Sequence, residues 1–216
     1  MEPFAFCLAL GPLGVYFLAL ARINLSRRPL VTTGGREIAA LGVALSGLML
    51  VGPMQLFFPQ QAATRFGWFV WILLIAFYFL CLTLWVLVAR ERIVIYNMTA
   101  SELQPALEQA ALRLDAGALW MGNHLLLPDR RVELDLEEFR SMRNVSLVAA
   151  RDEQSPSGWR SLYRELKTTL NSMPVSRNPR GFSLLSSGVL VWGAILFRGW
   201  SDPSGLARGF FEMLRP

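Results

Sequence analysis

The sequence predicts an α-helical membrane protein with three transmembrane helices, a short fourth helix, and a small α+β domain between the third and the fourth. Three observations predict this class. Long apolar runs fill the first ninety residues of the 216-residue chain, and the six charged residues between Glu2 and Arg90 all lie outside these runs. A bilayer requires such spacing, because a charge at its centre costs about 3 kcal/mol or more. Residues 92–175, by contrast, are polar and repeat their apolar positions at strand and helix spacings.

The first apolar segment runs from about Pro3 to Ala21. A secretory signal peptide is the alternative, since Ala19-Leu20-Ala21 resembles a cleavage site. However, the segment opens with Glu2 rather than with basic residues, and it is longer than the roughly 7–15 apolar residues of a signal peptide. We therefore interpret the segment as a transmembrane helix.

The second segment runs from about Ile38 to Phe58 and the third from about Gly67 to Val88. Each has about 20 residues, which suffices to cross a hydrocarbon core of ~30 Å. In the second segment, Gly52-Pro53 predicts a kink. Small residues four positions apart in the same segment predict the close approach of a neighbouring helix: Gly42 with Ser46, and Ala40 with Ala44.

The loops between these segments predict the orientation. The loop at residues 22–36 carries four arginines, whereas the loop at residues 59–66 carries only Arg65. Because cytoplasmic loops are enriched in Lys and Arg, the first loop is predicted to be cytoplasmic and the second external. We expect a multi-pass protein of a bacterial inner (cytoplasmic) membrane, with its N-terminus outside and residues 92–175 in the cytoplasm.

A fourth apolar run, from Phe182 to Phe197, has no charge but only 16 residues, which is short for a span. Arg177 and Arg180 precede it and Arg198 follows it, as expected for a short crossing helix. We interpret the run as a fourth transmembrane helix. A re-entrant or interfacial helix, or a buried element of the polar domain, is the alternative.

A C-terminal tail follows this run. Asp202-Pro203 predicts the start of a helix, because Asp is a favourable N-cap and Pro a favourable first helical residue. One face of this helix is predicted to be apolar, so we expect an amphipathic tail along the membrane surface; that face carries Leu206, Phe210, Met213 and Leu214.

The polar domain begins with a predicted strand at Ile93–Met98 and a helix. Thr99-x-x-Glu102 forms a capping box for that helix, and Gly117 ends it. A last helix opens at Ser155-Pro156. Between the two helices lie four short runs with strand character: Leu119–Met121, His124–Leu127, Val132–Leu136 and Asn144–Ala150.

The resulting order is β-α-β-β-β-β-α, from which we expect a mainly antiparallel sheet with two helices on one face. The chain then divides into a transmembrane region at 1–91, the α+β domain at 92–175, and the fourth helix with the tail at 176–216. The net charge is +5, but residues 92–176 carry ten basic and eleven acidic side chains. The excess positive charge flanks the apolar runs, so it does not predict binding to nucleic acid.

Two features of the domain are weak candidates for chemistry. His124 is the only histidine, and a zinc site needs three or four ligands, so we interpret it as structural or surface-exposed. Glu133, Asp135 and Glu137 alternate along one strand and face one side. Such a row could hold a cation or transfer protons, but nearby arginines favour a salt-bridged surface: Arg130, Arg131, Arg140 and Arg143. We expect no catalytic residue, metal or cofactor.

The loop before the second segment is the most suggestive stretch. Thr33 and two glycines lead into the N-terminus of a helix, where free N–H groups favour an anion. With Arg27, Arg28 and Arg36, they predict a site for an anionic phospholipid headgroup. Simple anchoring of the topology is the alternative interpretation of these arginines.

These observations favour a non-catalytic accessory or scaffold protein in the lipid bilayer. Its cytoplasmic domain would mediate protein interaction or homo-oligomerisation. The alternative is a membrane-surface enzyme or regulator that binds an anionic lipid headgroup or a phosphorylated ligand. The segments lack intramembrane charges, which argues against an ion-coupled transporter.

Overall fold

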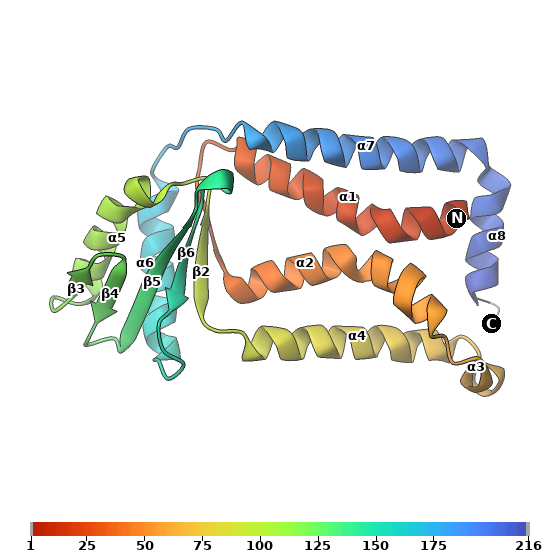
Figure 1. Ribbon diagram of the computed structural model, residues 1–216, viewed down its shortest axis with the longest axis horizontal. Helices are drawn as coiled ribbons and strands as arrows, with labels where there is room; N and C mark the ends of the chain where they lie inside the picture. The colour runs from red at the N-terminus through yellow and green to blue at the C-terminus, as the bar shows by residue number, and fades with distance from the viewer. Residues whose placement is uncertain (1, 215–216) are drawn as a thin grey trace. The chain divides into compact units, whose positions relative to one another are not determined.

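The computed structural model describes residues 2–214, apart from the side chains of residue 63 and residues 212–214. The chain forms two compact units (Figure 1). The helical unit contains residues 1–20, 38–87 and 183–216, and the sheet unit contains residues 21–37 and 88–182. The sheet unit therefore includes the segment between the first two apolar runs as well as the polar segment.

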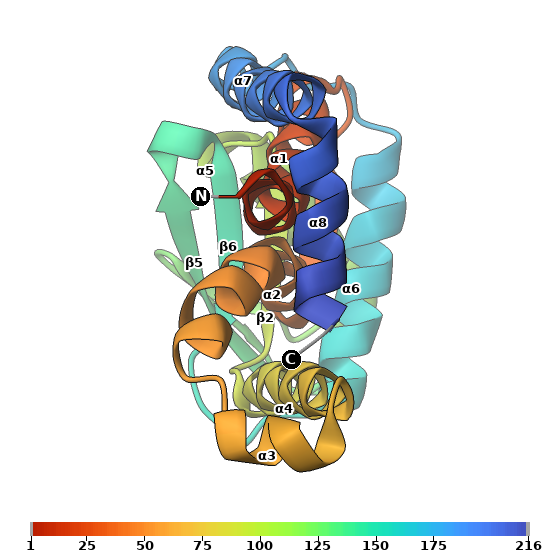
Figure 2. The same ribbon diagram turned by 90° about the vertical axis from the view of Figure 1, so that its right-hand side faces the viewer.

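Four helices in the described part of the chain are long and apolar enough to cross a membrane, by length and composition. They are α1 (Pro3–Leu25), α2 (Gly34–Met49) with its π-helical continuation η1 (Leu50–Met54), α4 (Phe69–Val88) and α7 (Arg180–Ser201). Two shorter helices, α3 (Gln60–Phe66) and α8 (Pro203–Leu214), complete the helical unit. Figure 2 shows α8 lying crosswise at the ends of the long helices.

The fourth long helix is longer than its apolar run. The sequence predicts 16 apolar residues, whereas α7 has 22 residues. Its first turn begins where the Asn178 side-chain oxygen accepts the backbone N–H of Arg180 at 3.1 Å, and it continues through Arg198. A charged residue need not end a helix, because Arg has a high helix propensity and its long side chain can carry the charge out of the apolar region. With 22 residues, α7 is long enough to cross a hydrocarbon core of ~30 Å.

Small residues bring the long helices together. A Cβ at Gly47 of α2 would lie 2.0 Å from the Leu8 carbonyl oxygen of α1. Gly42 lies against Leu82 of α4, and the Tyr78 hydroxyl donates a hydrogen bond of 2.7 Å to the Gly42 carbonyl. Of the residues predicted to pack, Gly42 and Ala44 are buried, Ser46 is half-buried and Ala40 is exposed, while Gly47 makes the tightest approach.

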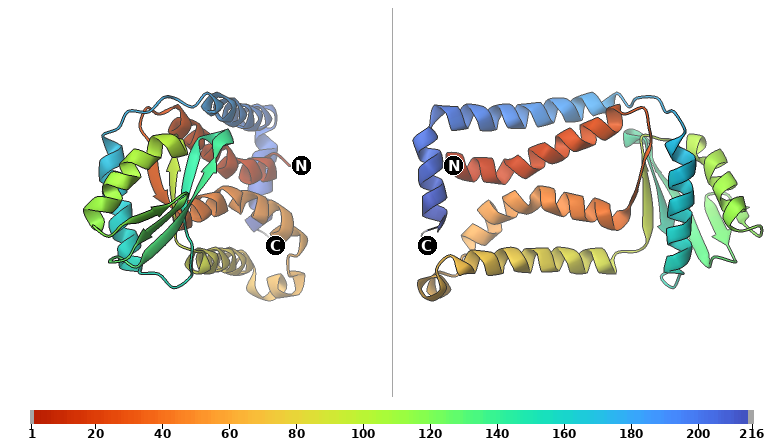
Figure 3. Two further views of the ribbon diagram at one scale, coloured as in Figure 1. Left: turned by 60° about the vertical axis from the view of Figure 1, so that its left-hand side comes forward. Right: turned by 180° about the vertical axis from the view of Figure 1, so that it is seen from behind.

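The sheet unit contains a six-stranded antiparallel sheet in the order β1-β2-β6-β5-β4-β3 (Figure 3). Its strands are β1 (Leu30–Thr33), β2 (Arg92–Tyr96), β3 (Leu119–Met121), β4 (His124–Leu127), β5 (Val132–Phe139) and β6 (Asn144–Ala149). A short 3-10 turn at Arg140–Met142 joins the last two. Gly122, with φ of 66°, forms the tight turn between β3 and β4.

Helices α5 (Ala100–Leu114) and α6 (Pro156–Asn171) cover one face of this sheet, as the sequence predicts. The core uses alternate strand residues, such as Leu125 and Leu127 of β4, together with Leu107 of α5 and Leu166 of α6. The predicted capping box is confirmed, since the Thr99 side chain and the N3 residue of α5 cap each other's backbone N–H groups.

The sequence prediction missed strand β1. The stretch Leu30–Thr33 was expected to be loop, but it pairs antiparallel with β2, with Val31 opposite Ile95. The stretch lies in the short connection between two apolar runs, and its pairing partner lies about 60 residues later in the chain, so no neighbouring strand marks it in the sequence. Val31 is buried in the core of the sheet unit, so this segment belongs to the sheet.

Candidate functional site

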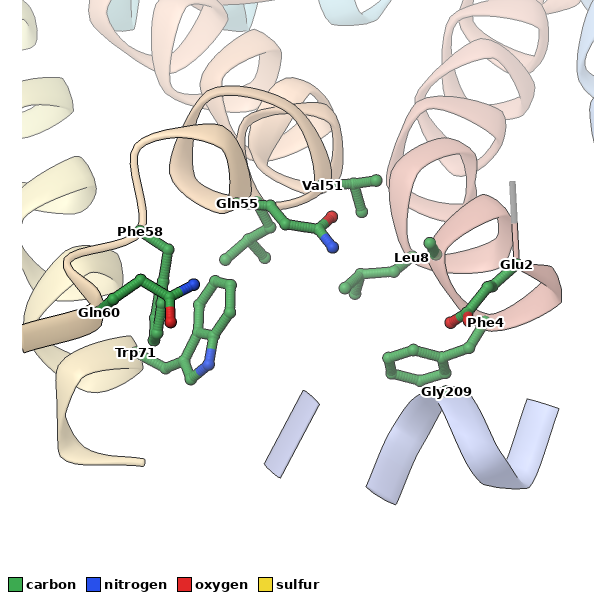
Figure 4. Close-up of a pocket in the computed structure, with 11 residues that line it drawn as sticks. Glu2, Phe4, Leu8, Val51, Gln55, Phe58, Gln60, Trp71 and Gly209 are labelled. Atoms are coloured by element: carbon green, nitrogen blue, oxygen red, sulfur yellow. The ribbon is translucent and has the colours of Figure 1, made fainter. Parts of the chain in front are cut away.

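A cavity of about 380 Å³ lies at one end of the helical unit (Figure 4). The first turns of α1, the π-helical segment η1 with the turn after it, the starts of α3 and α4, and α8 contribute its walls. We name it the end cavity. Its polar lining residues are Glu2, Gln55 and Gln60, and its aromatic ones are Phe4, Phe58 and Trp71.

A π-helical turn shapes one wall of the end cavity. Pro53 has no N–H to donate within a helix, and its ring would collide with the carbonyl four residues earlier in a regular α-helix. The chain instead widens into the π-helix Leu50–Met54 and then returns to an α-helical bond from the Phe57 N–H to the Pro53 carbonyl at 2.9 Å. Leu50, Val51 and Gln55 consequently all line the cavity. Single π-turns inside α-helices frequently occur at functional sites.

The aromatic walls are built by packing between elements. Phe58 and Trp71 stack with centroids 4.7 Å apart. On the opposite side, Phe4 of α1 meets Phe210 of α8 edge to face at 5.7 Å. Gly209 allows this approach, because a Cβ there would lie 2.8 Å from the Phe4 Cβ and 3.3 Å from a Glu2 carboxylate oxygen.

The second candidate is the sheet face that α5 and α6 leave uncovered. On β3, Leu119 and Met121 are 55% and 61% exposed. They are paired with Leu126 and His124 of β4 and so face the same side as these residues. The predicted carboxylate row continues this side on β5. We name this surface the open face, made of Leu119, Met121, His124, Leu126, Glu133, Asp135 and Glu137.

The carboxylate row of the open face has partners other than the expected arginines. The His124 Nε2 lies 3.1 Å from a Glu133 oxygen, and its Nδ1 lies 2.8 Å from an Asp135 oxygen. Glu133 also meets Arg151 at 2.9 Å, because the loop after β6 lies beside the start of β5. Among the four arginines expected to pair with the row, Arg140 pairs with Glu138 and Arg143 with Glu102.

Strand β1 separates the residues of the predicted headgroup site. Arg27 and Arg28 precede the strand and are exposed. Thr33 is the last residue of the strand and Arg36 follows it: the Thr33 hydroxyl accepts the Arg36 N–H at 3.4 Å, and the Arg36 guanidinium donates to the Tyr163 hydroxyl at 3.3 Å. At ~3.3 Å per residue the strand separates the two pairs by about 13 Å. The structure therefore places the four residues in two groups.

Buried asparagines join the segment before β1 to the segment before α7. The Asn178 amide donates to the Asn24 side-chain oxygen at 2.8 Å and to the Met142 carbonyl at 2.9 Å. The Val175 N–H donates to the Arg27 carbonyl at 2.9 Å. These bonds bring the chain around Arg27 and Arg28 next to residues 175–180, although some 150 residues of sequence separate the two segments.

Two carboxylates of the sheet unit have perturbed acidity. Burial opposes ionisation of Glu102, but the Thr99 N–H and the Arg143 guanidinium outweigh it, so that its pKa lies below the ordinary value of 4.5. The Ala100 N–H, followed by Arg140, lowers the pKa of Glu138. When ionised, both carboxylates thus stabilise the N-terminus of α5.

Sequence spacing identified only the carboxylate row of the open face, because the rest of that face and the whole end cavity combine residues from several elements. In the described part of the chain, no group of three His, Cys, Asp or Glu side chains is placed to hold a metal ion. No protein-family model, curated protein or solved structure matches the chain.

Proposed function

We propose that this protein is a four-span protein of a bacterial inner membrane that acts as a non-catalytic scaffold, its cytoplasmic sheet unit docking a protein partner. The four long apolar helices support the membrane location. The observation that carries the docking role is the open face, where exposed apolar side chains lie beside exposed carboxylates.

The open face has the composition of a docking surface. Leu119 and Met121 leave more than half of their area in water, while the other face of the same sheet is covered by two helices. Exposed apolar patches with polar rims are typical of protein interaction sites. Asp135 and Glu137 form that rim and are exposed.

Charge indicates the partner's chemistry. Glu133 is already neutralised by Arg151, which leaves Asp135, shared with His124, and Glu137 to attract a cation. We expect a partner segment with apolar residues flanked by Lys or Arg, from another protein or from a second copy of this chain. Complementary charge of this kind raises association rates and orients the partner.

Site-specific photo-crosslinking in cells tests this role. Met121 on the open face and Leu112 on α5 are 61% and 62% exposed, and each is replaced by p-benzoylphenylalanine in the full-length chain. We expect a discrete adduct from position 121 and none from position 112. The adduct's mass, measured by mass spectrometry, separates a second copy from another protein.

Charge reversal makes the same test sharper. Glu137→Lys is expected to abolish the adduct from position 121, whereas Glu108→Lys on α5 leaves it unchanged. Equal adducts from positions 112 and 121, or an adduct insensitive to Glu137→Lys, would contradict docking on the open face.

A second candidate function, binding of an anionic lipid headgroup, is favoured by the asparagine contacts beside β1. They bring exposed Arg27 and Arg28 next to the segment that carries exposed Arg177, and clustered arginines attract anionic headgroups. Anionic lipid that copurifies with the protein should decrease in Arg27→Ala/Arg28→Ala but not in Arg36→Ala, which lies at the other end of β1. Equal lipid content in all three proteins would refute this candidate.

A further inference from the structure

We propose that the end cavity binds the primary ammonium group of a phospholipid headgroup of the phosphatidylethanolamine type. The inference rests on the proposed membrane location but not on the docking role of the open face. It concerns a pocket of the helical unit that is lined by one carboxylate, two side-chain amides and aromatic rings.

The polar groups of the cavity match a primary ammonium. Glu2 is the single charged side chain among the described lining residues, and it gives the cavity a negative charge. An –NH₃⁺ group has three N–H donors and no acceptor. Figure 4 shows Glu2 at one end of the cavity and Gln60 at the other, with Gln55 between them, so hydrogen-bond acceptors line the length of a headgroup and the carboxylate marks the end that takes the ammonium. A quaternary ammonium has no N–H and could not use them.

The aromatic rings attract a cation of either kind, so they add affinity while the acceptors supply the preference for a primary ammonium. Phe58 and Trp71 form a stacked pair on one wall, and Phe4 lies on another. The faces of Trp and Phe attract cations, by about 0.5–2 kcal/mol for each contact. Because the amides of Gln55 and Gln60 also carry N–H groups, the same walls can donate to the phosphate of a zwitterionic headgroup.

The position of the cavity indicates a lipid as the source. It is lined by the first turns of α1 and α4 and by the last part of the α2 segment, so it lies where three candidate spans end. The ends of spans meet the headgroup layer, where Trp side chains are also enriched. Leu8, Leu50 and Val51 supply apolar wall toward the middle of the helices, which suits the glycerol and upper acyl region of a lipid.

Lipid competition on the full-length protein tests the proposal. The protein is purified in mild detergent and exposed to equal amounts of phosphatidylethanolamine, phosphatidylcholine and phosphatidylglycerol with identical acyl chains. Native mass spectrometry then counts each bound lipid. We expect phosphatidylethanolamine to exceed each competitor by about tenfold, the effect of one hydrogen bond to a charged group.

Paired variants locate the binding site. Glu2→Gln keeps the side-chain shape and should remove the preference. Gln60→Leu should reduce it, whereas Gln61→Leu on the same helix should not. Trp71→Leu should reduce it, whereas Trp68→Leu, outside the cavity lining, should not. Unchanged thermal unfolding of Glu2→Gln shows that lost binding is not lost folding.

Three results would overturn the proposal: equal binding of the three lipids, a preference that survives Glu2→Gln, or saturable binding of soluble O-phosphoethanolamine without any lipid preference. The last would assign the cavity to a free amine. Carbonate extraction of cell membranes tests the membrane location separately, so its failure is distinguishable from failure of the lipid site.

Discussion

Gly47 shows how closely two helices of the helical unit approach each other. A methyl group at this position would lie 2.0 Å from the Leu8 carbonyl oxygen and 2.9 Å from that of Ala9, and neither backbone atom can move without displacing α1. In lipid no hydrophobic effect drives helices together, so their association depends on close packing, which small residues permit, and on interhelical hydrogen bonds. The approach of α1 to α2 therefore depends on a single missing side chain.

We accordingly predict that Gly47→Ala destabilises the detergent-solubilised protein by about 2 kcal/mol, the range for overpacking. Gly193→Ala in α7 is the matched control, since nothing lies within 4 Å of its Cβ position. Thermal unfolding of the two variants measures the difference. Equal melting temperatures for both variants would show that α1 and α2 do not approach as described.

Glu102 couples the start of α5 to Arg143. Its folded pKa is depressed, so the stability that it contributes is present above the ordinary value of 4.5 and is lost as the pH falls through the folded pKa. The contact also satisfies the guanidinium Nη2 at 2.8 Å and 3.0 Å.

We predict that Glu102→Gln is less stable than wild type at pH 7 but loses less stability when the pH falls below 4.5. Glu108→Gln, on the same helix, serves as control and should follow wild type. Unfolding of the sheet unit by urea at a series of pH values measures this. Parallel pH profiles for wild type and Glu102→Gln would contradict the assigned cause.

At the scale of elements, β1 decides how the sheet ends. Without it, β2 would be an edge strand with unpaired backbone groups, which invites wrong pairing. With it, β2 has a neighbour on each side, β1 and β6. The strand also adds Val31 to the core.

We predict that Val31→Ser destabilises the sheet unit by about 2 kcal/mol, through a lost apolar contact and a buried hydroxyl. Thr32→Ser, on the other face of β1, should cost much less. Hydrogen–deuterium exchange of residues 92–96 in the full-length protein gives the readout. Protection of these amides that does not respond to Val31→Ser would exclude β1 from the sheet.

At the scale of the molecule, the number of spans decides where the termini lie. With the four spans that we propose, the two termini are expected on one side of the membrane and residues 92–175 on the other, whereas with three spans the C-terminus is expected on the side of residues 92–175. Length and composition favour four spans, because α7 has 22 residues.

We predict that single cysteines at Gln61 and Ser204 react with a membrane-impermeant maleimide in intact cells, in a background without Cys7 and Cys81. A cysteine at Asp129 should react only after permeabilisation. If the cysteine at position 204 also reacts only after permeabilisation, like that at position 129, then α7 does not span the membrane.

Local patterns predicted most of the elements. Apolar runs predicted the long helices, and short runs with apolar residues at alternate positions predicted β2 to β6 in their order along the chain. The capping box located the start of α5 at Thr99. Each of these signals resides within a few adjacent residues, so a single stretch of chain carries the whole of it.

Contacts between residues that are distant in the sequence could not be predicted from such local patterns. The sequence predicts one headgroup site made of Arg27, Arg28, Thr33 and Arg36, whereas in the structure strand β1 lies between Arg28 and Arg36. No pattern in the sequence indicates that Glu2 shares a cavity with Trp71. Neither residue is unusual in its own segment.

The amino-acid sequence by itself thus determined the type and order of most elements, though not of β1 or α3, because helix and strand periodicity and the exclusion of charge from apolar runs are local properties. Only the tertiary structure decided that Leu30–Thr33 joins the sheet, that Asn24 meets Asn178, and that the π-turn at Pro53 opens a cavity. These features depend on which surfaces meet after the elements have formed, and no spacing along the chain encodes that.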